Sequence, residues 1–285
     1  MPDWPLLWKQ LVEVQTGAMK KKGDRDGDSW AEKARSFDEG VKRRWSKPDS
    51  TRRFLVDLLK AHPGSSVLDI GAGTGSWACM LAPHAVKVTA LEPSPAMIAV
   101  MEEKIRELGI GNVEIIQDSW PGACVDDHDF SLCSHAMYGS TDFPFFVQRM
   151  NEVTRRCCLL LMRAPTPDGI MAKIAREVWG QPHDSPNFQI AYNILLQMGI
   201  FANVLMEDSG QWKPWTNDSL DEAVAEVKRK LGLDGHDSHD PFIRKILQEN
   251  LTLDDGRLSW PSGVCSALAY WFKHPLKRLR AVKRS

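Results

Sequence analysis

The sequence predicts an α/β fold built on a doubly wound, parallel sheet, and two observations support this prediction. Residues 67–75 read Val-Leu-Asp-Ile-Gly-Ala-Gly-Thr-Gly, an apolar run typical of a strand buried on both faces, followed by glycine at every second position. A helical pattern starts at Ser76, so a glycine turn joins the strand to a helix N-terminus. Further apolar runs follow, separated by helical patterns, and this alternation indicates parallel strands linked by right-handed crossovers.

Composition bounds the class of protein. The chain has 285 residues, 43% of them hydrophobic, which is enough for one large core with insertions or for a core and a small second domain. The formal net charge of −1 provides no overall field that would steer the protein toward nucleic acid. The sequence has no apolar run of roughly 18 residues and no basic stretch followed by an apolar one at the N-terminus, so we expect neither a membrane span nor a signal peptide. The six cysteines form no C-x-x-C pair, which predicts reduced thiols in a cytoplasmic protein.

Helical patterns occupy the N-terminal part of the chain. Leu6, Leu7, Leu11 and Val14 recur at helical spacing, and Ser29 is a candidate N-cap for a second helix. The expected helices cover residues 3–18, 29–44 and about 50–61. The first two would form a cap over residues 1–48.

The remaining elements follow from the hydrophobic periodicity. Strands are expected at residues 67–70, 86–91, 113–117, 130–134, 157–162, 201–206 and 264–272. Helices are expected at residues 76–81, 96–108, 143–153, 170–178, 188–198, 219–231 and 240–250. This pattern divides the chain into a cap at 1–48, a core at 49–207, a helical insertion at 208–262, a last core strand at 263–273 and a basic tail at 274–285.

Tryptophan is abundant, with 11 residues, and most of them lie outside the expected strands. Large rings in peripheral segments predict an apolar roof over a cavity. The peripheral set comprises Trp4, Trp8, Trp30, Trp45, Trp179, Trp212, Trp215 and Trp260.

The glycine turn points to a nucleotide ligand. Glycine lets a ligand approach the backbone, and Glu92 at the end of the second strand can accept two hydrogen bonds from a ribose diol. A dinucleotide site would need a glycine where the chain has Ser76. The pattern D-x-G-x-G-x-G over residues 69–75, with Glu92 and with Asp118 after the third strand, instead resembles the class I S-adenosylmethionine (SAM) methyltransferases. The resemblance covers residues 50–165 well and the remainder loosely.

This resemblance implies more about the fold. In the family the last two strands form a hairpin that inserts one antiparallel strand, so we expect a seven-stranded, mostly parallel sheet whose last strand is antiparallel. The insertion at 208–262 would then rise over the carboxyl ends of the strands as a substrate lid. The N-terminal helices would cover the cofactor, with packing on the sheet as the alternative.

The resemblance also implies a set of cofactor contacts. The glycines would lie against the methionine half of SAM, Asp69 would orient the turn or meet the amino group, and Glu92 would hold the ribose. Asp118 would accept from the adenine amine, and core packing is the alternative role for Met97 and Trp120. The full set is Asp69, Gly71, Ala72, Gly73, Gly75, Glu92, Pro93, Ser94, Met97, Asp118, Ser119, Trp120 and Ser134.

In this family the end of the fourth strand faces the transferring methyl group. Methyl transfer is an in-line displacement that depends on alignment, and it needs a base only if the acceptor arrives protonated. His135 is the candidate base and Tyr138 a candidate for positioning the acceptor. The alternative is a histidine that is hydrogen-bonded for structural reasons.

The absence of several motifs excludes some classes of methyltransferase. The fourth strand is followed neither by Asn-Pro-Pro-Tyr or Asp-Pro-Pro-Tyr, nor by Pro-Cys, nor by an acidic triplet. These absences argue against amino-methyltransferases of adenine and glutamine, against cytosine enzymes and against a catalytic metal. His236 and His239, with interleaved aspartates, could bind a divalent ion or form a solvated loop. The tail at 274–285 could touch a phosphate-bearing partner or be a solvated terminus.

The sequence therefore predicts a cytoplasmic enzyme that transfers a methyl group from SAM to a small molecule and releases S-adenosylhomocysteine. Two alternatives stay open. An RNA or protein methyltransferase would need a continuous positive surface leading to the crevice. A SAM-binding module without catalysis would have no space for an acceptor beside the methyl group.

Overall fold

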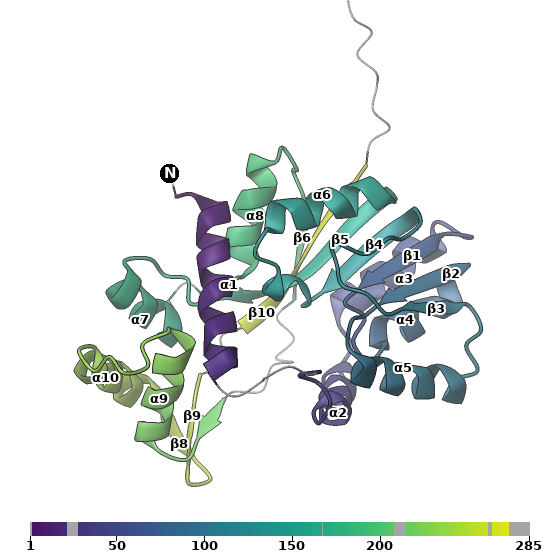
Figure 1. The fold of residues 1–285 in the computed structure, drawn as a ribbon. Coiled ribbons are helices and arrows are strands. Elements are labelled where there is room, and N and C mark those ends of the chain that lie inside the picture. The colour runs from purple at the N-terminus through teal and green to yellow at the C-terminus, as the bar shows by residue number, and fades with distance from the viewer. Residues whose placement is uncertain (1, 22–27, 167, 208–214, 262–263, 274–285) are drawn as a thin grey trace, which may run out of the picture.

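The computed structural model describes residues 2–21, 28–166, 168–207, 215–261 and 264–273 of the chain. A seven-stranded sheet forms its centre, in the order β3-β2-β1-β4-β5-β10-β6 (Figure 1). The strands are β1 Ser66–Ile70, β2 Lys87–Leu91, β3 Val113–Ile116, β4 His128–Ser134, β5 Thr154–Pro165, β6 Asn203–Glu207 and β10 Val264–Phe272.

The direction of the strands confirms the predicted fold class. Strands β1 to β5 pair with one another in parallel. Strand β10 lies between β5 and β6 and runs antiparallel to both. The sheet is therefore seven-stranded and mostly parallel with its last strand antiparallel, and the carboxyl ends of β1 to β5 meet at one edge.

Helices cover both faces of the sheet, because each buried strand carries apolar side chains on both sides. Leu68 and Ile70 of β1 belong to a core shared with α1, α6 and α8, whereas Val67 belongs to a core shared with α3, α4 and α5. The bounds are α1 Trp4–Lys21, α3 Ser50–Lys60, α4 Ser76–Leu81, α5 Pro95–Glu107, α6 Phe143–Val153 and α8 Phe188–Gln197.

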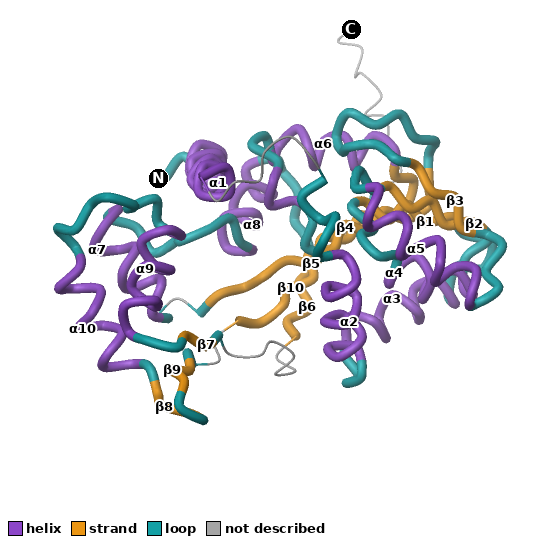
Figure 2. The backbone as a smooth tube through the Cα atoms, turned by 60° about the horizontal axis from the view of Figure 1, so that its bottom comes forward, coloured by secondary structure: helices purple, strands orange, loops and turns teal. Residues whose placement is uncertain are grey.

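The two N-terminal helices take different places. Helix α1 packs along α8 and α6, whereas α2, Ala34–Trp45, packs against α5 on the other side of the molecule (Figures 1 and 2). The predicted start of α2 at Ser29 is wrong. Residues 29–33 form turns, and the helix begins without a side-chain cap.

A second, smaller module lies beyond the carboxyl end of β5 (Figure 2). Its apolar core joins helices α7, α9 and α10 and includes the buried Trp260. A three-stranded sheet in the order β7-β9-β8, which the sequence did not predict, flanks these helices. The bounds are α7 Ile170–Trp179, α9 Leu220–Lys230, α10 Asp240–Asn250, β7 Thr216–Asn217, β8 Thr252–Asp254 and β9 Arg257–Ser259.

Most of the peripheral tryptophans belong to these cores. Trp8 is fully buried against Phe143, and Trp260 donates its indole N–H to Asn217 Oδ1 at 2.7 Å. Trp212, with residues 208–214, and the tail at 274–285 lie outside the described residues. Within the described ranges, no helix combines the length and apolar character needed to cross a bilayer.

Candidate active site

The glycine turn after β1 has three glycines with positive φ, but they serve two purposes. A Cβ on Gly71 would lie 2.2 Å from Cβ of Ala136, and one on Gly75 would lie 2.4 Å from Cγ of Met101. Both positions therefore need glycine for packing. At Gly73, with φ +56°, a Cβ would meet Cε1 of Phe37 at an ordinary 3.7 Å. Gly73 is thus the position where the turn faces the overlying helix α2 rather than the core.

Glu92, at the end of β2, is tied directly to this turn. Its carboxylate accepts hydrogen bonds from Gly73 N at 2.8 Å and from Ser94 N at 2.9 Å, and only 6% of the residue is exposed. Burial raises the pKa of Glu92, and the nearby charge of Asp28 adds to this rise. Each carboxylate oxygen has room for a second donor, so Glu92 can still accept from a diol.

Asp69, at the end of β1, is buried with an unsatisfied oxygen. Only 1% of the residue is exposed, and Oδ2 has no hydrogen-bond partner among the described residues. Burial raises the pKa of Asp69 to about 7, although a hydrogen bond from Ala78 N opposes the shift. A buried oxygen without a donor is costly, so this carboxylate is suited to a cationic ligand group.

The N-terminal segment closes over the start of α5. Asp28 accepts from Ser94 Oγ at 2.7 Å and from Ala96 N at 2.9 Å, while Ser94 Oγ caps the helix by accepting from Met97 N. Burial raises the pKa of Asp28, but these hydrogen bonds and one from Trp30 N outweigh it and leave the pKa lowered. Met97 is 2% exposed and packs against α2, as core packing requires.

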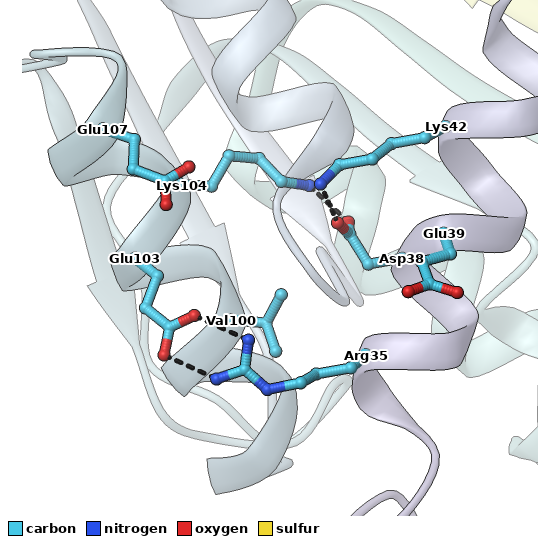
Figure 3. A pocket seen from close by; sticks show the side chains of 8 residues that line it. All are labelled: Arg35, Asp38, Glu39, Lys42, Val100, Glu103, Lys104 and Glu107. Carbon is cyan, nitrogen blue, oxygen red and sulfur yellow. Dashed lines mark hydrogen bonds and ion pairs between the residues drawn. The ribbon is translucent and has the colours of Figure 1, made fainter.

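An ion-pair network fastens α2 beside the glycine turn (Figure 3). Asp38 is buried and accepts from Thr74 Oγ1 at 2.7 Å and from Lys104 Nζ at 2.5 Å, with Lys42 Nζ at 3.0 Å. Because Thr74 belongs to the turn itself, α2 is held directly over it. Burial would raise the pKa of Asp38, but the three donors outweigh this effect and lower the pKa.

The end of β3 is more open. Asp118 and Ser119 are exposed, and Ser119 N donates to Asp118 Oδ1 at 2.7 Å. Trp120 donates its indole N–H to the carbonyl oxygen of Phe146 at 3.2 Å and packs edge-on against that ring. The indole is therefore anchored to α6, which supports a packing role for Trp120.

The end of β4 brings His135 and Tyr138 together. Ser134 is the last residue of the strand, and His135 follows it with φ +56°. His135 Nδ1 lies 3.1 Å from the Tyr138 hydroxyl, which accepts from Arg163 N at 2.6 Å. Burial lowers the pKa of His135 to about 3, and the charges of Arg44 and Arg163 contribute, so the ring is neutral at pH 7. Burial also raises the pKa of Tyr138 to about 12.

Comparison with known proteins identifies the central region. Residues 67–157 match the family model described as methyltransferase domain. Over 108 residues the chain is 31% identical to demethylmenaquinone methyltransferase of Bacillus cytotoxicus, covering 36% of this chain and 45% of that protein. Over 87 residues it is 36% identical to the probable cobalt-precorrin-6B C(15)-methyltransferase (decarboxylating) of Methanobrevibacter smithii, covering 30% of this chain and 46% of that protein. The matches thus span about half the length of these relatives.

Solved structures show the same fold. The YcgJ protein of Bacillus subtilis superposes with a TM-score of 0.53 at 17% identity, covering 78% of this chain and 97% of that one. YjhP of E. coli gives a TM-score of 0.51 at 14% identity, covering 93% and 99%. Residues 67–157 thus match a methyltransferase domain, and the sheet around them has the fold of these two solved structures.

Sequence reasoning missed two cations, one at the end of β5 and one at the end of α9. Arg163, at the end of β5, donates from its guanidinium to Ser185 Oγ in the loop before α8. Lys230, at the end of α9, lies 2.9 Å from Glu226 and 3.0 Å from the ring centroid of Trp215. The sequence signal for Arg163 was an arginine placed directly after an apolar strand. For Lys230 nothing in the sequence distinguished it from a solvated helix residue.

The methyltransferase domain and its neighbouring module hold no cluster of three His, Cys, Asp or Glu side chains suited to a metal, as far as the described residues extend. His236 and His239 are exposed. The aspartates beside them, Asp237 and Asp240, pair with Lys228 at 2.5 and 2.9 Å.

Proposed function

We propose that this protein is a methyltransferase that transfers a methyl group from SAM to a small-molecule acceptor by direct in-line displacement. The observation that carries the proposal is the arrangement at the ends of β1 and β2. There the unsatisfied oxygen of Asp69, the backbone of Gly73 beneath helix α2 and the carboxylate of Glu92 lie together at one turn. A methyltransferase domain over residues 67–157 supports the same reading.

The residues of this turn fit SAM. Asp69 has a buried oxygen that lacks a donor, and the ammonium of the methionine part would supply one. Gly73 presents bare backbone, and Glu92 keeps acceptor capacity for the ribose hydroxyls. We assign the further contacts to Gly71, Ala72, Gly75, Pro93, Ser94, Met97, Asp118, Ser119, Trp120 and Ser134.

When bound, SAM supplies a methyl group on a sulfonium, with a neutral thioether as leaving group. The protein's part is alignment, and we assign it to the residues after β4. Tyr138 is fixed by Arg163 N and in turn fixes His135 at 3.1 Å. His135 is neutral at pH 7 because its pKa is lowered to about 3, mainly by burial, so it can accept a proton from the acceptor but only weakly.

We assign the cofactor to the core formed by residues 49–207 with 263–273, and the acceptor to the side facing the cap at 1–48 and the insertion at 208–262. The small-molecule acceptor is inferred from the two relatives, whose names specify demethylmenaquinone and cobalt-precorrin-6B. We also propose a cytoplasmic location, since Cys79, Cys133, Cys157 and Cys158 are buried free thiols that fit a reducing compartment.

Calorimetry with SAM, S-adenosylhomocysteine and NAD⁺ tests the proposal. We expect one equivalent of each SAM-derived ligand to bind and NAD⁺ not to bind. A screen of metabolite pools with methyl-labelled SAM should then reveal a labelled small molecule. Failure to bind S-adenosylhomocysteine, or preference for NAD⁺, would remove the assignment. Tight binding without any methyl transfer would identify a non-catalytic SAM-binding module.

A further inference from the structure

We propose that the methyl acceptor carries an oxyanionic group, a carboxylate or a phosphate, and that this group binds between Arg163 and Lys230. The inference rests on the proposed function and names the substrate class of that same site. It follows from three features of the described residues: a guanidinium without an anionic partner, the convergence of positive charge from three elements, and the nearness of both to His135.

Arg163 is the central observation. It lies at the end of β5, where its main-chain N–H donates to the Tyr138 hydroxyl at 2.6 Å and its guanidinium donates to Ser185 Oγ. The Nε atom is buried without a hydrogen-bond partner among the described residues, and no carboxylate in those ranges forms an ion pair with this side chain. A buried guanidinium donor that lacks a partner is costly, and the planar fork of the group matches an oxyanion.

Positive charge converges on this place from α2, β5 and α9. The charges that act on the pKa of His135, after burial, are those of Arg44 and Arg163, and both lower it. Burial is also the main cause of the lowered pKa of Lys230, and the charge of Arg163 adds to that effect. The charge of Arg163 therefore acts on His135 in the methyltransferase domain and on Lys230 in the smaller module.

The nearby carboxylates do not cancel this charge. Glu226 already accepts from Lys230 and from Asn217 Nδ2 at 2.9 Å. The charge of Asp184 raises the pKa of Lys230, but Asp184 accepts a hydrogen bond from Ser185 Oγ at 3.2 Å and forms none with Arg163 among the described residues. Both nearby carboxylates are thus engaged by other donors, and neither pairs with Arg163 among the described residues, which leaves this guanidinium suited to an anionic ligand.

The contrast with the cleft between α2 and α5 strengthens the argument. That cleft is also rich in charge, but Arg35 is held by both oxygens of Glu103, and Lys42 and Lys104 share Asp38 (Figure 3). Its cations are satisfied internally. At the end of β5 the guanidinium of Arg163 instead has no anionic partner among the described residues, and the main-chain N–H of the same residue is linked to His135 by two hydrogen bonds through Tyr138. The anion would therefore bind beside the reacting centre.

Small anions provide a probe that needs no knowledge of the acceptor. Acetate, inorganic phosphate and neutral acetamide are titrated into the protein, with and without S-adenosylhomocysteine, while NMR follows the ring signal of His135, assigned with His135→Gln. An anion beside Arg163 should raise the pKa of His135, because it offsets the guanidinium charges, and acetamide should not. The acetate and phosphate arms show which oxyanion the site prefers.

Variants locate the effect. Arg163→Gln should weaken anion binding about tenfold or more, as expected for the loss of a charge-assisted contact, and Arg163→Lys should restore part of it. Arg156→Gln is the matched control, because Arg156 lies at the opposite end of β5 and pairs with Asp129. Circular dichroism melts of each variant establish that it folds.

The outcomes separate the two proposals. Equal response of His135 to anions in the wild type and in Arg163→Gln, or no response to either anion in the wild type, overturns the oxyanion subsite. Failure of S-adenosylhomocysteine to bind, with the anion effect intact, overturns the proposed function instead. Once an acceptor is found, Arg163→Gln should raise its KM about tenfold with a smaller change in kcat, and a neutral acceptor would contradict the inference.

Discussion

Two corners of the same sheet edge, one at the ends of β1 and β2 and one at the end of β5, differ in how far the protein itself provides partners for their polar groups. At the ends of β1 and β2 the polar groups mostly find partners inside the protein: Glu92 binds two main-chain N–H groups, and Asp38 holds the helix above. At the end of β5 the guanidinium of Arg163 stays without an anion among the described residues. The first corner is therefore prebuilt, because its polar groups mostly have partners before a ligand binds. The second corner has a cation that no described anion balances.

This difference fits a division of labour. A corner that binds the same cofactor in every turnover benefits from rigid, satisfied contacts, since preorganisation reduces the entropy lost on binding. A corner that selects one acceptor can leave a charge unpaired, because a wrong ligand then fails to satisfy it. Among the described residues, the exception at the first corner is Asp69 Oδ2, which we assign to the cationic end of the cofactor.

Gly73→Val should produce the largest effect at the prebuilt corner. The branched side chain would occupy the space between the turn and Phe37 and strain a backbone with φ +56°, so we expect affinity for S-adenosylhomocysteine to fall on the order of 100-fold. Calorimetry measures this loss. Gly64→Val is the matched control, because Gly64 has φ +78° but no atom within 4 Å of its added Cβ. Tight binding by Gly73→Val would contradict the placement of the cofactor.

His135→Ala tests the second corner. We expect kcat for an acceptor found in the screen to fall about tenfold, less than the usual general-base contribution because the pKa of His135 is lowered to about 3, with S-adenosylhomocysteine affinity nearly unchanged. Tyr138→Phe should reduce kcat less, because it removes the hydroxyl that orients His135 but leaves the ring. Unaltered turnover in His135→Ala would remove this residue as the base.

The sequence predicted the first corner well because its determinants are local. A buried strand, glycines at alternate positions and an acidic residue at the next strand end occupy adjacent stretches of chain, and the structure joins them at one turn. The central strands and helices also follow from periodicity, and the antiparallel β10 followed from the family resemblance. What local pattern could not show is that Gly71 and Gly75 are required by distant neighbours, Ala136 and Met101.

The second corner depends on contacts between segments that are remote in the sequence, so no local sequence pattern predicts it. Arg163 meets Ser185 from a loop 22 positions away, and Lys230 approaches from the smaller module. The start of α2 was misplaced for the same reason. Asp28 accepts a hydrogen bond from Trp30 N, and its carboxylate also accepts from Ser94 Oγ and Ala96 N at the start of α5. Contacts with a distant helix terminus therefore fix the turn that precedes α2.

The pKa of Asp69 predicts a pH dependence of binding at the first corner. Because that pKa is about 7, pairing with an ammonium group must release a proton below pH 7. Affinity for S-adenosylhomocysteine should therefore rise up to about tenfold per pH unit toward pH 7 and then level off, and Asp69→Asn should flatten the profile. The raised pKa of Asp69 has the opposite effect on the stability of the free protein. The free energy of unfolding falls as the pH rises from about 4 to about 7, since the folded state binds the proton of Asp69 more tightly than the unfolded state does. A pH-independent affinity in the wild type would show that Asp69 does not meet the cofactor's charge.

The last prediction concerns stability rather than binding, in the helix that covers the prebuilt corner. Asp38→Asn leaves the buried Lys104 without its carboxylate, and breaking such a buried pair costs on the order of 3 kcal/mol of unfolding free energy. Urea unfolding measures this, and Glu39→Gln, the exposed neighbour on α2, should stay close to the wild type. The lowered pKa of Asp38 sets the pH range: its contribution is present above the ordinary value of 3.8 and is lost as the pH falls through the folded-state pKa. If Asp38→Asn were as stable as Glu39→Gln, the network would not be what fastens α2 over the glycine turn, and the two corners would differ less than their contacts indicate.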